Sequence, residues 1–310
     1  HLSLRRQRQM CIRDRYTTGL RLVFGESDGL PGLIVDKYGD FLVVEVSSLG
    51  MERVKDLWLD VLVDLYKPRG IYEKSISPVL EEEGMEPYEG VLWGQEPPPL
   101  VEFTEGNWRF FADIKAGQKT GFYLDQRESR KLVAHFSSGK RVLNTFSYTG
   151  GFTVSAFSGG AKEVVSVDTS NKALDLVKLH IETNDFSDRE HLEVERDVFA
   201  FLREAKGFDV VILDPPGFAR KGKDVEKATR AYKDINLYGA KALNRGGILF
   251  TFSCSNRVSL GLFKKIVFSA LLDADREGRI IAYLFQPLDH PVSVYFPESE
   301  YLKGLVIVVE

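Results

Sequence analysis

Residues 208–218 read FDVVILDPPGF, a near-continuous apolar run that ends in an acid, two prolines and an aromatic residue. The run predicts a buried strand that carries Asp214 to the edge of a sheet. Pro215 and Pro216 stiffen the backbone that follows and remove its N–H donors. Such a rigid turn can hold a flat base against its carbonyls and Phe218, and the alternative reading is an ordinary structural loop.

Short apolar runs alternate with helical patterns on both sides of this strand. The pattern of residues 170–184, for example, is helical. Alternation of this kind predicts βαβ units and a mostly parallel sheet, and the runs at 279–288 and 301–310 are expected to add edge strands. The predicted strands of the sheet itself are 141–146, 163–168, 192–197, 208–216 and 246–254.

The chain divides into three parts by its pattern. Residues 16–115 show short strands, one helix and turn-rich loops, which predict a small α+β domain, and residues 116–310 form the βαβ domain. Residues 1–15 hold five arginines without periodicity and no Met at position 1. A basic arm or a targeting peptide would be alternatives, but we interpret this segment as non-native or disordered.

Bulk composition excludes several classes of function. The chain has 310 residues, 44% of them hydrophobic, and a net charge of −4, which does not by itself indicate nucleic-acid binding. Its two cysteines, Cys11 and Cys254, give neither a disulfide framework nor metal-ligand spacing, so we expect no metal and a reducing cytoplasm. No apolar run reaches the roughly 18 residues of a membrane span, so we expect no membrane association.

The ends of the predicted strands carry residues suited to a cofactor. The Thr149–Gly151 turn enters a helix, where glycines permit close approach and free N–H groups face a ligand. Asp168 ends the second strand and suits a ribose diol, and Asp197 follows the third. Together they favour an adenosine-type cofactor over simple turns and helix caps, although Asp168, Thr169 and Ser170 could each cap a helix.

Cys254 ends the strand predicted at 246–254, between two serines. A lone cysteine at the end of an apolar strand is most often inert packing. At the mouth of a site it could instead act as a nucleophile, and its position beside the strand that ends in Asp214 favours that reading.

Several strings resemble a known family. VLNTFSYTGGF (142–152), VVSVDTS (164–170), FDVVILDPPGF and TFSCS (251–255) resemble class I S-adenosylmethionine-dependent methyltransferases, and more narrowly the bacterial family that makes 5-methylcytosine in large-subunit ribosomal RNA. Residues 24–44, 119–130, 231–236 and 289–304 match that family too. The resemblance implies a Rossmann-like domain with a mostly parallel seven-stranded sheet and an antiparallel last strand, preceded by a small α+β domain.

The resemblance also implies roles for individual residues. Cys254 would attack cytosine C6, and Asp214 would lie beside the methionine end of the cofactor and the target base. Asp168 would bind the ribose and Asp197 the adenine amino group. The candidate contacts to S-adenosylmethionine are Asn144, Phe146, Ser147, Tyr148, Thr149, Gly150, Asp168, Thr169, Ser170, Asp197, Asp214 and Pro215.

The expected partner is ribosomal RNA of the large subunit, and the sequence leaves a homodimer open. The family usually begins with a PUA domain, which we do not find in this chain, and Gly217 stands where related enzymes have Lys or Cys. His290 and Glu298 are read as structural. The candidate RNA contacts are Lys119, Tyr123, Gln126, Arg127, Pro216, Phe218 and Arg220, and exposed basic loops are otherwise simply solvated.

Two other functions stay open from the sequence. An enzyme that methylates an exocyclic amino group would also use an Asp-Pro-Pro turn with an aromatic residue and would not need Cys254. A non-catalytic RNA-binding or assembly factor would retain the fold without turnover. The first alternative predicts that activity survives replacement of Cys254. The second predicts that the chain does not bind S-adenosylmethionine.

Overall fold

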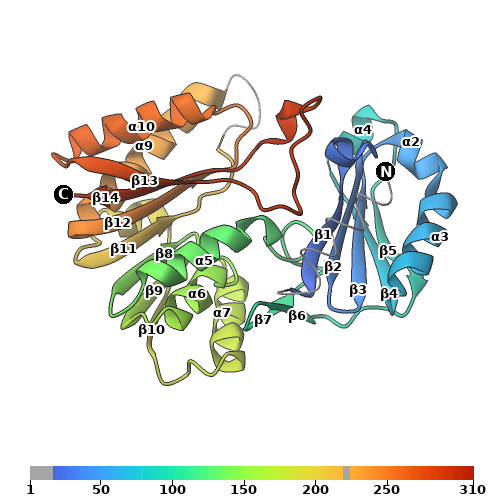
Figure 1. The fold of residues 1–310 in the computed structure, drawn as a ribbon, viewed down its shortest axis with the longest axis horizontal. Helices are drawn as coiled ribbons and strands as arrows, with labels where there is room; N and C mark the ends of the chain where they lie inside the picture. The colour runs from blue at the N-terminus through green and yellow to red at the C-terminus, as the bar shows by residue number, and fades with distance from the viewer. Residues whose placement is uncertain (1–16, 78, 219–223) are drawn as a thin grey trace. The chain divides into compact units, whose positions relative to one another are not determined.

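The structure, a computed structural model, describes residues 17–77, 79–218 and 224–310. These residues form two units (Figure 1). The first contains the described residues up to Asp125 together with Pro287–Ser299, and the second contains Gln126–Gln286 and Glu300–Glu310. The boundary predicted between residues 115 and 116 differs from this division, and the segment Pro287–Ser299 was expected in the second part.

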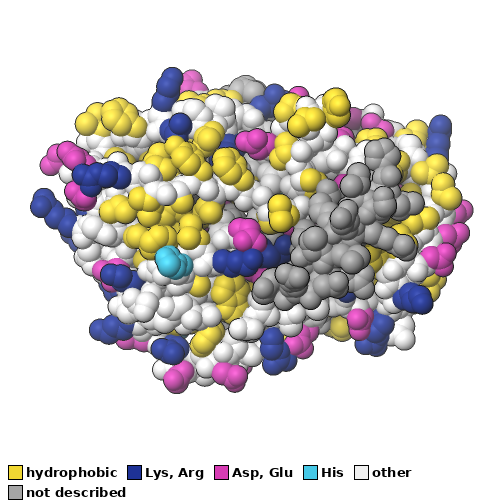
Figure 2. All heavy atoms as spheres, in the orientation of Figure 1, with side chains coloured by type: hydrophobic (Ala, Val, Ile, Leu, Met, Phe, Trp, Pro, Cys, Tyr) yellow, Lys and Arg dark blue, Asp and Glu magenta, His cyan; other side chains and the backbone are white. Residues whose placement is uncertain are grey.

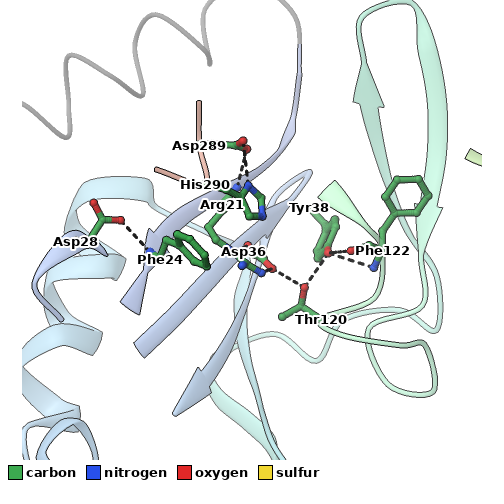
Figure 3. A network of polar contacts seen from close by, with 9 residues as sticks. All are labelled: Arg21, Phe24, Asp28, Asp36, Tyr38, Thr120, Phe122, Asp289 and His290. Carbon is green, nitrogen blue, oxygen red and sulfur yellow. Dashed lines mark hydrogen bonds and ion pairs between the residues drawn. The ribbon is translucent and has the colours of Figure 1, made fainter. Parts of the chain in front are cut away.

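A network of polar contacts explains why residues 116–125 and Pro287–Ser299 belong to the first unit (Figure 3). The Tyr38 hydroxyl lies 2.8 Å from the Thr120 hydroxyl and donates to the Phe122 carbonyl at 3.2 Å. The carboxylate of Asp289 accepts the backbone N–H of Arg21 at 3.1 Å. Because these groups are buried, their hydrogen bonds fix the two segments to the first sheet.

The first unit is built on a five-stranded sheet in the order β1-β2-β3-β4-β5, in which only the β3–β4 pair is parallel. A separate hairpin pairs β6 with β7. The elements of this part of the chain are β1 (Gly19–Phe24), η1 (Gly25–Asp28), β2 (Leu33–Tyr38), β3 (Phe41–Val46), α2 (Leu49–Arg53), α3 (Lys55–Tyr66), β4 (Gly70–Ser75), α4 (Val79–Glu82), β5 (Tyr88–Gly94), β6 (Val101–Glu105), β7 (Trp108–Ala112), η2 (Leu124–Gln126) and η4 (Pro297–Ser299).

Helix α3 packs its buried Trp58 and Leu62 against the alternating apolar residues of this sheet, such as Leu20 and Val35. Strand β5 was not expected from the sequence, because its residues are mostly exposed on both faces and show no alternation. The small α+β character of this part of the chain follows from these elements.

The second unit is built on a seven-stranded sheet in the order β10-β9-β8-β11-β12-β14-β13. The first five strands in this order are parallel to one another, and β14 is antiparallel to both of its neighbours. Its elements are α5 (Arg127–Phe136), β8 (Arg141–Thr145), α6 (Gly151–Ser158), β9 (Glu163–Asp168), α7 (Asn171–Thr183), β10 (Glu190–Glu195), α8 (Val198–Leu202), β11 (Phe208–Leu213), α9 (Val225–Ala242), β12 (Leu243–Ser253), α10 (Leu260–Asp273), β13 (Gly278–Leu284) and β14 (Lys303–Val309).

Helices cover both faces of this sheet. One apolar cluster joins Val133 of α5, Phe152 of α6 and Val177 of α7 to one face. The other joins Tyr232 of α9 and Phe263 of α10, together with α8, to the opposite face. This three-layer arrangement confirms the predicted Rossmann-like fold with a mostly parallel sheet and an antiparallel last strand.

The prediction that residues 301–310 form an edge strand was wrong. Strand β14 lies between β12 and β13, and β13 forms the edge. Strand β13 therefore exposes apolar side chains, among them Ile281 and Tyr283, and α10 exposes Phe268 and Leu272. Figure 2 shows hydrophobic side chains gathered over this part of the second unit.

The described helices and acidic, histidine and cysteine side chains bear on membranes and metals. Of the helices in the described ranges, none has the length and apolar character needed to cross a bilayer. Within the same ranges, His, Cys, Asp and Glu side chains do not gather in groups of three or more that suit a metal ion. The expectations of no membrane and no metal stay predictions.

Candidate active site at the carboxyl ends of the strands

The turn from β8 into α6 holds an unusual backbone. Phe146, Tyr148 and Gly150 all have positive φ values, of 53°, 45° and 79°. Left-handed conformations are costly for bulky residues, and such strain is concentrated at ligand sites. At Gly150 a Cβ atom would also come within 2.9 Å of the Val177 side chain, so that only glycine fits both the conformation and the space.

Hydrogen bonds from neighbouring elements hold this turn in place. The backbone N–H of Ser147 donates to Val167 at 3.1 Å, and that of Tyr148 donates to Asp168 Oδ2 at 2.8 Å. The buried ring of His180 donates from Nδ1 to the Thr149 carbonyl at 2.7 Å. The turn is therefore anchored on both β9 and α7 and presents a fixed surface.

Two hydroxyls of this turn, Ser147 Oγ and Thr149 Oγ1, are buried and have no hydrogen-bond partner in the described part of the chain. The Asn144 Oδ1 atom near the end of β8 is in the same state, while its amide nitrogen donates to Thr153 at 3.0 Å. Buried polar atoms are rarely left without a partner, so these atoms fit a site that receives a polar ligand.

Asp168 ends β9 and organises its surroundings through both carboxylate oxygens. Oδ1 accepts the backbone N–H of Ser170 at 2.9 Å, and the Ser170 hydroxyl caps α7 by accepting from Ala173 at 3.3 Å. The capping role considered from the sequence is therefore real for Ser170. Each carboxylate oxygen can accept a second hydrogen bond, so Asp168 retains the capacity to accept from a ribose diol. Thr169 beside it is exposed.

Asp197 is the N-cap of α8, and its Oδ1 accepts the backbone N–H of Ala200 at 2.9 Å. Its strand, β10, runs parallel to β9 with Glu195 opposite Asp168, so Asp197 lies just beyond the same edge of the sheet. The side chain is exposed. Position and exposure are compatible with an adenine contact, and the cap is the structural alternative.

Aromatic rings continue along this edge. Phe199 lies 6.3 Å from Phe146 and 6.0 Å from Phe218, measured between ring centroids, and Phe218 lies 4.8 Å from Tyr232. Neither Phe199 nor Tyr232 was predicted from the sequence as a site residue. The sequence did contain signals for both, because Phe199 lies two residues after Asp197 and Tyr232 lies in residues 231–236, which match the family.

Asp214 follows β11 directly, and the side-chain amide of Gln126 donates to its Oδ1 at 3.0 Å. Gln126 is 3% exposed, and its Oε1 atom has no hydrogen-bond partner among the described residues. Gln126, predicted as an RNA contact, is thus placed to orient the Asp214 carboxylate. Pro215 is buried and Pro216 exposed, so the rigid turn shows one proline to solvent.

Cys254 follows β12, the strand beside β11, and is partly exposed rather than sealed in the core. Its Sγ atom lies 4.0 Å from the Pro215 carbonyl oxygen. A Cβ atom added to Gly217 would lie 3.5 Å from the same sulfur, so the Asp-Pro-Pro-Gly turn borders the thiol. The structure therefore brings together Asp214, its two prolines and Cys254, which lie about 40 residues apart in sequence.

Tyr232 closes the other side of this turn. Its hydroxyl accepts from Ser253 Oγ at 3.1 Å, one residue before Cys254. Burial raises the pKa of Tyr232 to about 12, and the nearby charges of Cys254 and Asp214 act in the same direction. The phenol is therefore neutral at ordinary pH and serves as a fixed hydrogen-bonding group.

The remaining RNA candidates are differently placed. Lys119 and Tyr123 belong to the first unit, where the Lys119 ammonium lies 5.6 Å from the centre of the Tyr123 ring. Arg127 is only 3% exposed, which disfavours the phosphate contact predicted for it and favours a structural role. Arg220 lies outside the described residues.

Comparison with known proteins identifies the family. Residues 86–279 match the family model described as S-adenosylmethionine-dependent methyltransferase. The chain is 47% identical over 301 residues to ribosomal RNA large subunit methyltransferase I of Aeromonas hydrophila, covering 96% of this chain and 76% of that protein. It is 45% identical over 288 residues to the protein of the same name from Escherichia coli, with 92% and 73% covered.

Solved structures agree with the fold and the cofactor. A crystal structure of a methyltransferase complexed with SAH matches with a TM-score of 0.87 and 27% identity, covering 99% of this chain and 79% of that one. An S-adenosylmethionine-dependent methyltransferase from Streptococcus mutans matches with a TM-score of 0.85 and 26% identity, covering 98% and 78%. The predicted cofactor, S-adenosylmethionine, is confirmed. By its sequence, its fold and these matches, the chain belongs to the ribosomal RNA large subunit methyltransferase I family of S-adenosylmethionine-dependent methyltransferases.

Proposed function

We propose that this chain transfers the methyl group of S-adenosylmethionine to C5 of a cytosine in large-subunit ribosomal RNA, through a covalent adduct between Cys254 and cytosine C6. The names of the relatives support ribosomal RNA of the large subunit as the substrate. Those names give neither base nor atom. The observation that supports cytosine C5 as the methylated atom is the partly exposed thiol of Cys254 beside the Asp214–Pro216 turn.

The cofactor, when bound, supplies an electrophilic methyl group on its sulfonium. In our proposal the Phe146–Gly150 turn holds its methionine part through backbone groups and the buried hydroxyls of Ser147 and Thr149. Asp168 accepts hydrogen bonds from the ribose, and Asp197 accepts one from the adenine amino group. Phe146 and Phe199 lie at the same edge and suit the face of the adenine ring.

Cytosine C5 needs activation before it can take a methyl group. The thiolate of Cys254 would form a bond to C6, which moves the C5–C6 π electrons onto C5 and makes that carbon nucleophilic. S-adenosylmethionine would supply the methyl group: C5 would form a bond to the methyl carbon, and the methyl–sulfur bond would break with its electron pair going to sulfur. Loss of the C5 proton to a base regenerates the C5–C6 double bond while the C6–S bond breaks and the thiolate leaves.

Asp214 is placed to act on the pyrimidine. In its protonated form it would donate to cytosine N3 and draw electrons from the ring, which favours attack at C6. As an anion it would oppose the formation of a thiolate nearby. The hydrogen bond of 3.0 Å from Gln126 Nε2 to Asp214 Oδ1 fixes the direction of the carboxyl group. The target nucleotide must leave its stack to reach this edge of the sheet.

The Asp214–Phe218 turn also suits an enzyme that methylates an exocyclic amino group. Phe218 packs at 4.8 Å from Tyr232 and supplies an aromatic face beside the acid. This second candidate does not use a thiol. A Cys254→Ala variant would retain methyl transfer in that case and would lose it in ours.

The decisive experiment uses large-subunit RNA that has not been methylated and that contains 5-fluorocytosine in place of cytosine. A base can remove the C5 hydrogen as a proton but cannot remove fluorine from C5, so the last step is blocked. The chain and S-adenosylmethionine should therefore give a covalent protein–RNA adduct that survives denaturing electrophoresis. The adduct should form in a Cys11→Ser chain and be absent from Cys254→Ala. Methyl transfer with no adduct, or an adduct that persists in Cys254→Ala, would refute the proposed nucleophile. Isothermal titration with S-adenosylmethionine controls for an intact cofactor site.

A further inference from the structure

Lys303 is a buried basic side chain that the proposed reaction leaves unused. It begins β14, pairs with Ser253 in the register of the sheet, and is 3% exposed. Its Nζ atom donates to the Ser255 carbonyl at 2.8 Å. Lys303 therefore reaches the residue after Cys254 from the strand beside it.

Among the described residues, no carboxylate forms an ion pair with this ammonium. In the ranges that the structure describes, Lys303 takes part in no salt bridge, and its acidic neighbour Glu300 is exposed to solvent. A buried lysine without an ion-pair partner is costly to the fold. Such a cost is generally tolerated where the charge serves a site.

We propose that Lys303 is a positioning residue for the reaction: its buried ammonium fixes the Ser255 carbonyl and stabilises the thiolate of Cys254. The inference rests on the proposed function, because it assigns Lys303 to the nucleophile of that reaction. Lys303 does not touch the base and acts only through Cys254. Formation of the thiolate releases the thiol proton to solvent, and the ammonium keeps its own proton throughout.

The electrostatics of the pair support this assignment. Burial lowers the pKa of Lys303, and the largest effect in the opposite direction is the charge of Cys254, followed by that of Glu300. An interaction between two charges is the same seen from either partner, so an ammonium favoured by the thiolate favours the thiolate equally. A nearby lysine is a known means of activating a cysteine.

Two other groups near Cys254, Asp214 and Tyr232, do not favour the thiolate. Asp214 lies on the neighbouring strand end and disfavours a second negative charge when it is ionised. Tyr232 interacts with both Asp214 and Cys254 but is neutral, since burial raises its pKa to about 12. Lys303, in contrast, carries a positive charge that interacts with Cys254 and favours the thiolate.

The test measures the reactivity of the thiol rather than methyl transfer. Alkylation of Cys254 by iodoacetamide is followed from about pH 5 to pH 10 in the Cys11→Ser chain, since only the thiolate reacts. Lys303→Met removes the charge and keeps the length of the side chain. We expect its alkylation at pH 7 to be about tenfold slower, which corresponds to a shift of the profile by about one pH unit.

Lys264→Met is the matched control, because Lys264 is an exposed lysine of α10 in the same unit. Its profile should coincide with that of the parent chain. Superimposable profiles for the parent, Lys303→Met and Lys303→Gln would overturn the inference. If neither Lys303 variant folds, the parent chain is compared with itself in urea. The native thiol should then react at lower pH than the unfolded one, and the opposite order would overturn the inference.

This experiment separates the two proposals. A profile that shifts as expected, with no adduct to 5-fluorocytosine RNA, leaves the Lys303–Cys254 pairing in place and refutes the proposed reaction. An adduct that depends on Cys254, with no shift on removing Lys303, refutes only the role of Lys303.

Discussion

Substitution of Gly150 by alanine tests how the turn after β8 is built. The residue has a φ of 79°, and an added Cβ atom would lie 2.9 and 3.0 Å from the two methyl groups of Val177, which is fully buried in α7. A left-handed alanine costs about 1–2 kcal/mol. Displacing a stiff β-branched side chain in a packed core costs about 1–3 kcal/mol more, so the expected loss of stability is about 2–5 kcal/mol.

Two further variants separate these contributions. Gly139 has a φ of 69° and nothing within 4 Å of the added Cβ atom, so Gly139→Ala should cost only the conformational part, about 1–2 kcal/mol. Val177→Ala removes the two methyl groups. In that background only the Cβ atom of residue 177 stays close, at 3.2 Å, so Gly150→Ala should fall toward about 1–2 kcal/mol, although Val177→Ala is itself destabilising. The difference between the two backgrounds measures the steric part.

Urea unfolding followed by far-ultraviolet circular dichroism is the appropriate assay, combined with hydrogen exchange of α6 and α7. Tryptophan fluorescence is unsuitable, because Trp58, Trp93 and Trp108 all belong to the first unit. Titration calorimetry should also show weaker binding of S-adenosylmethionine to Gly150→Ala. If Gly150→Ala costs no more than Gly139→Ala, the close packing of the turn on α7 is not what requires glycine.

Three further predictions concern other parts of the chain. Asp36→Asn removes the buried carboxylate that accepts two hydrogen bonds of 2.8 and 2.7 Å from Arg21. Breaking this ion pair should lower the free energy of unfolding of the first unit by about 3–5 kcal/mol, read by tryptophan fluorescence, and an unchanged urea midpoint would contradict the prediction. The pKa of Tyr232 is about 12 in the folded chain against an ordinary value of 10.0, so the stability it contributes is complete below pH 10 and is lost as pH rises toward 12. Tyr232→Phe should lessen the alkaline loss of stability by about 2–3 kcal/mol, and parallel curves of stability against pH for the two chains would contradict a raised pKa at Tyr232. Gln126→Leu removes the 3.0 Å hydrogen bond to Asp214 and should reduce kcat about tenfold while S-adenosylmethionine binds as before, whereas a loss of cofactor affinity with normal kcat would place Gln126 in the cofactor site instead.

The sequence predicted the central sheet well where strands are buried on both faces. The strand predicted at 163–168 is β9, and the run at 208–216 contains β11. Strand β10 begins two residues before the predicted 192–197, because its half-exposed residues give a weaker apolar signal. Periodicity predicts elements, but the insertion of β14 between β12 and β13 depends on pairing between distant segments, which local pattern does not encode.

The candidate site shows the same division. Glycine turns and acids at strand ends marked Gly150, Asp168 and Asp214, because ligands of parallel sheets lie beyond these ends. Lys303 gave no signal, since a lysine at the start of a strand is usually solvated, and its burial follows only from the three-dimensional packing. The buried state of Arg127 was missed for the same reason: a charged helix residue gives no local sign of its depth.

The return of Pro287–Ser299 to the first unit has a consequence for biosynthesis. A ribosome delivers the first 125 residues long before the segment that carries Asp289. The backbone N–H of Arg21 therefore stays hydrated until the segment that carries Asp289, 268 residues later in the sequence, has been synthesised. Maturation of the first unit is thus tied to synthesis of a segment that follows most of the second unit, and a chain truncated before residue 287 would lack a piece of both units.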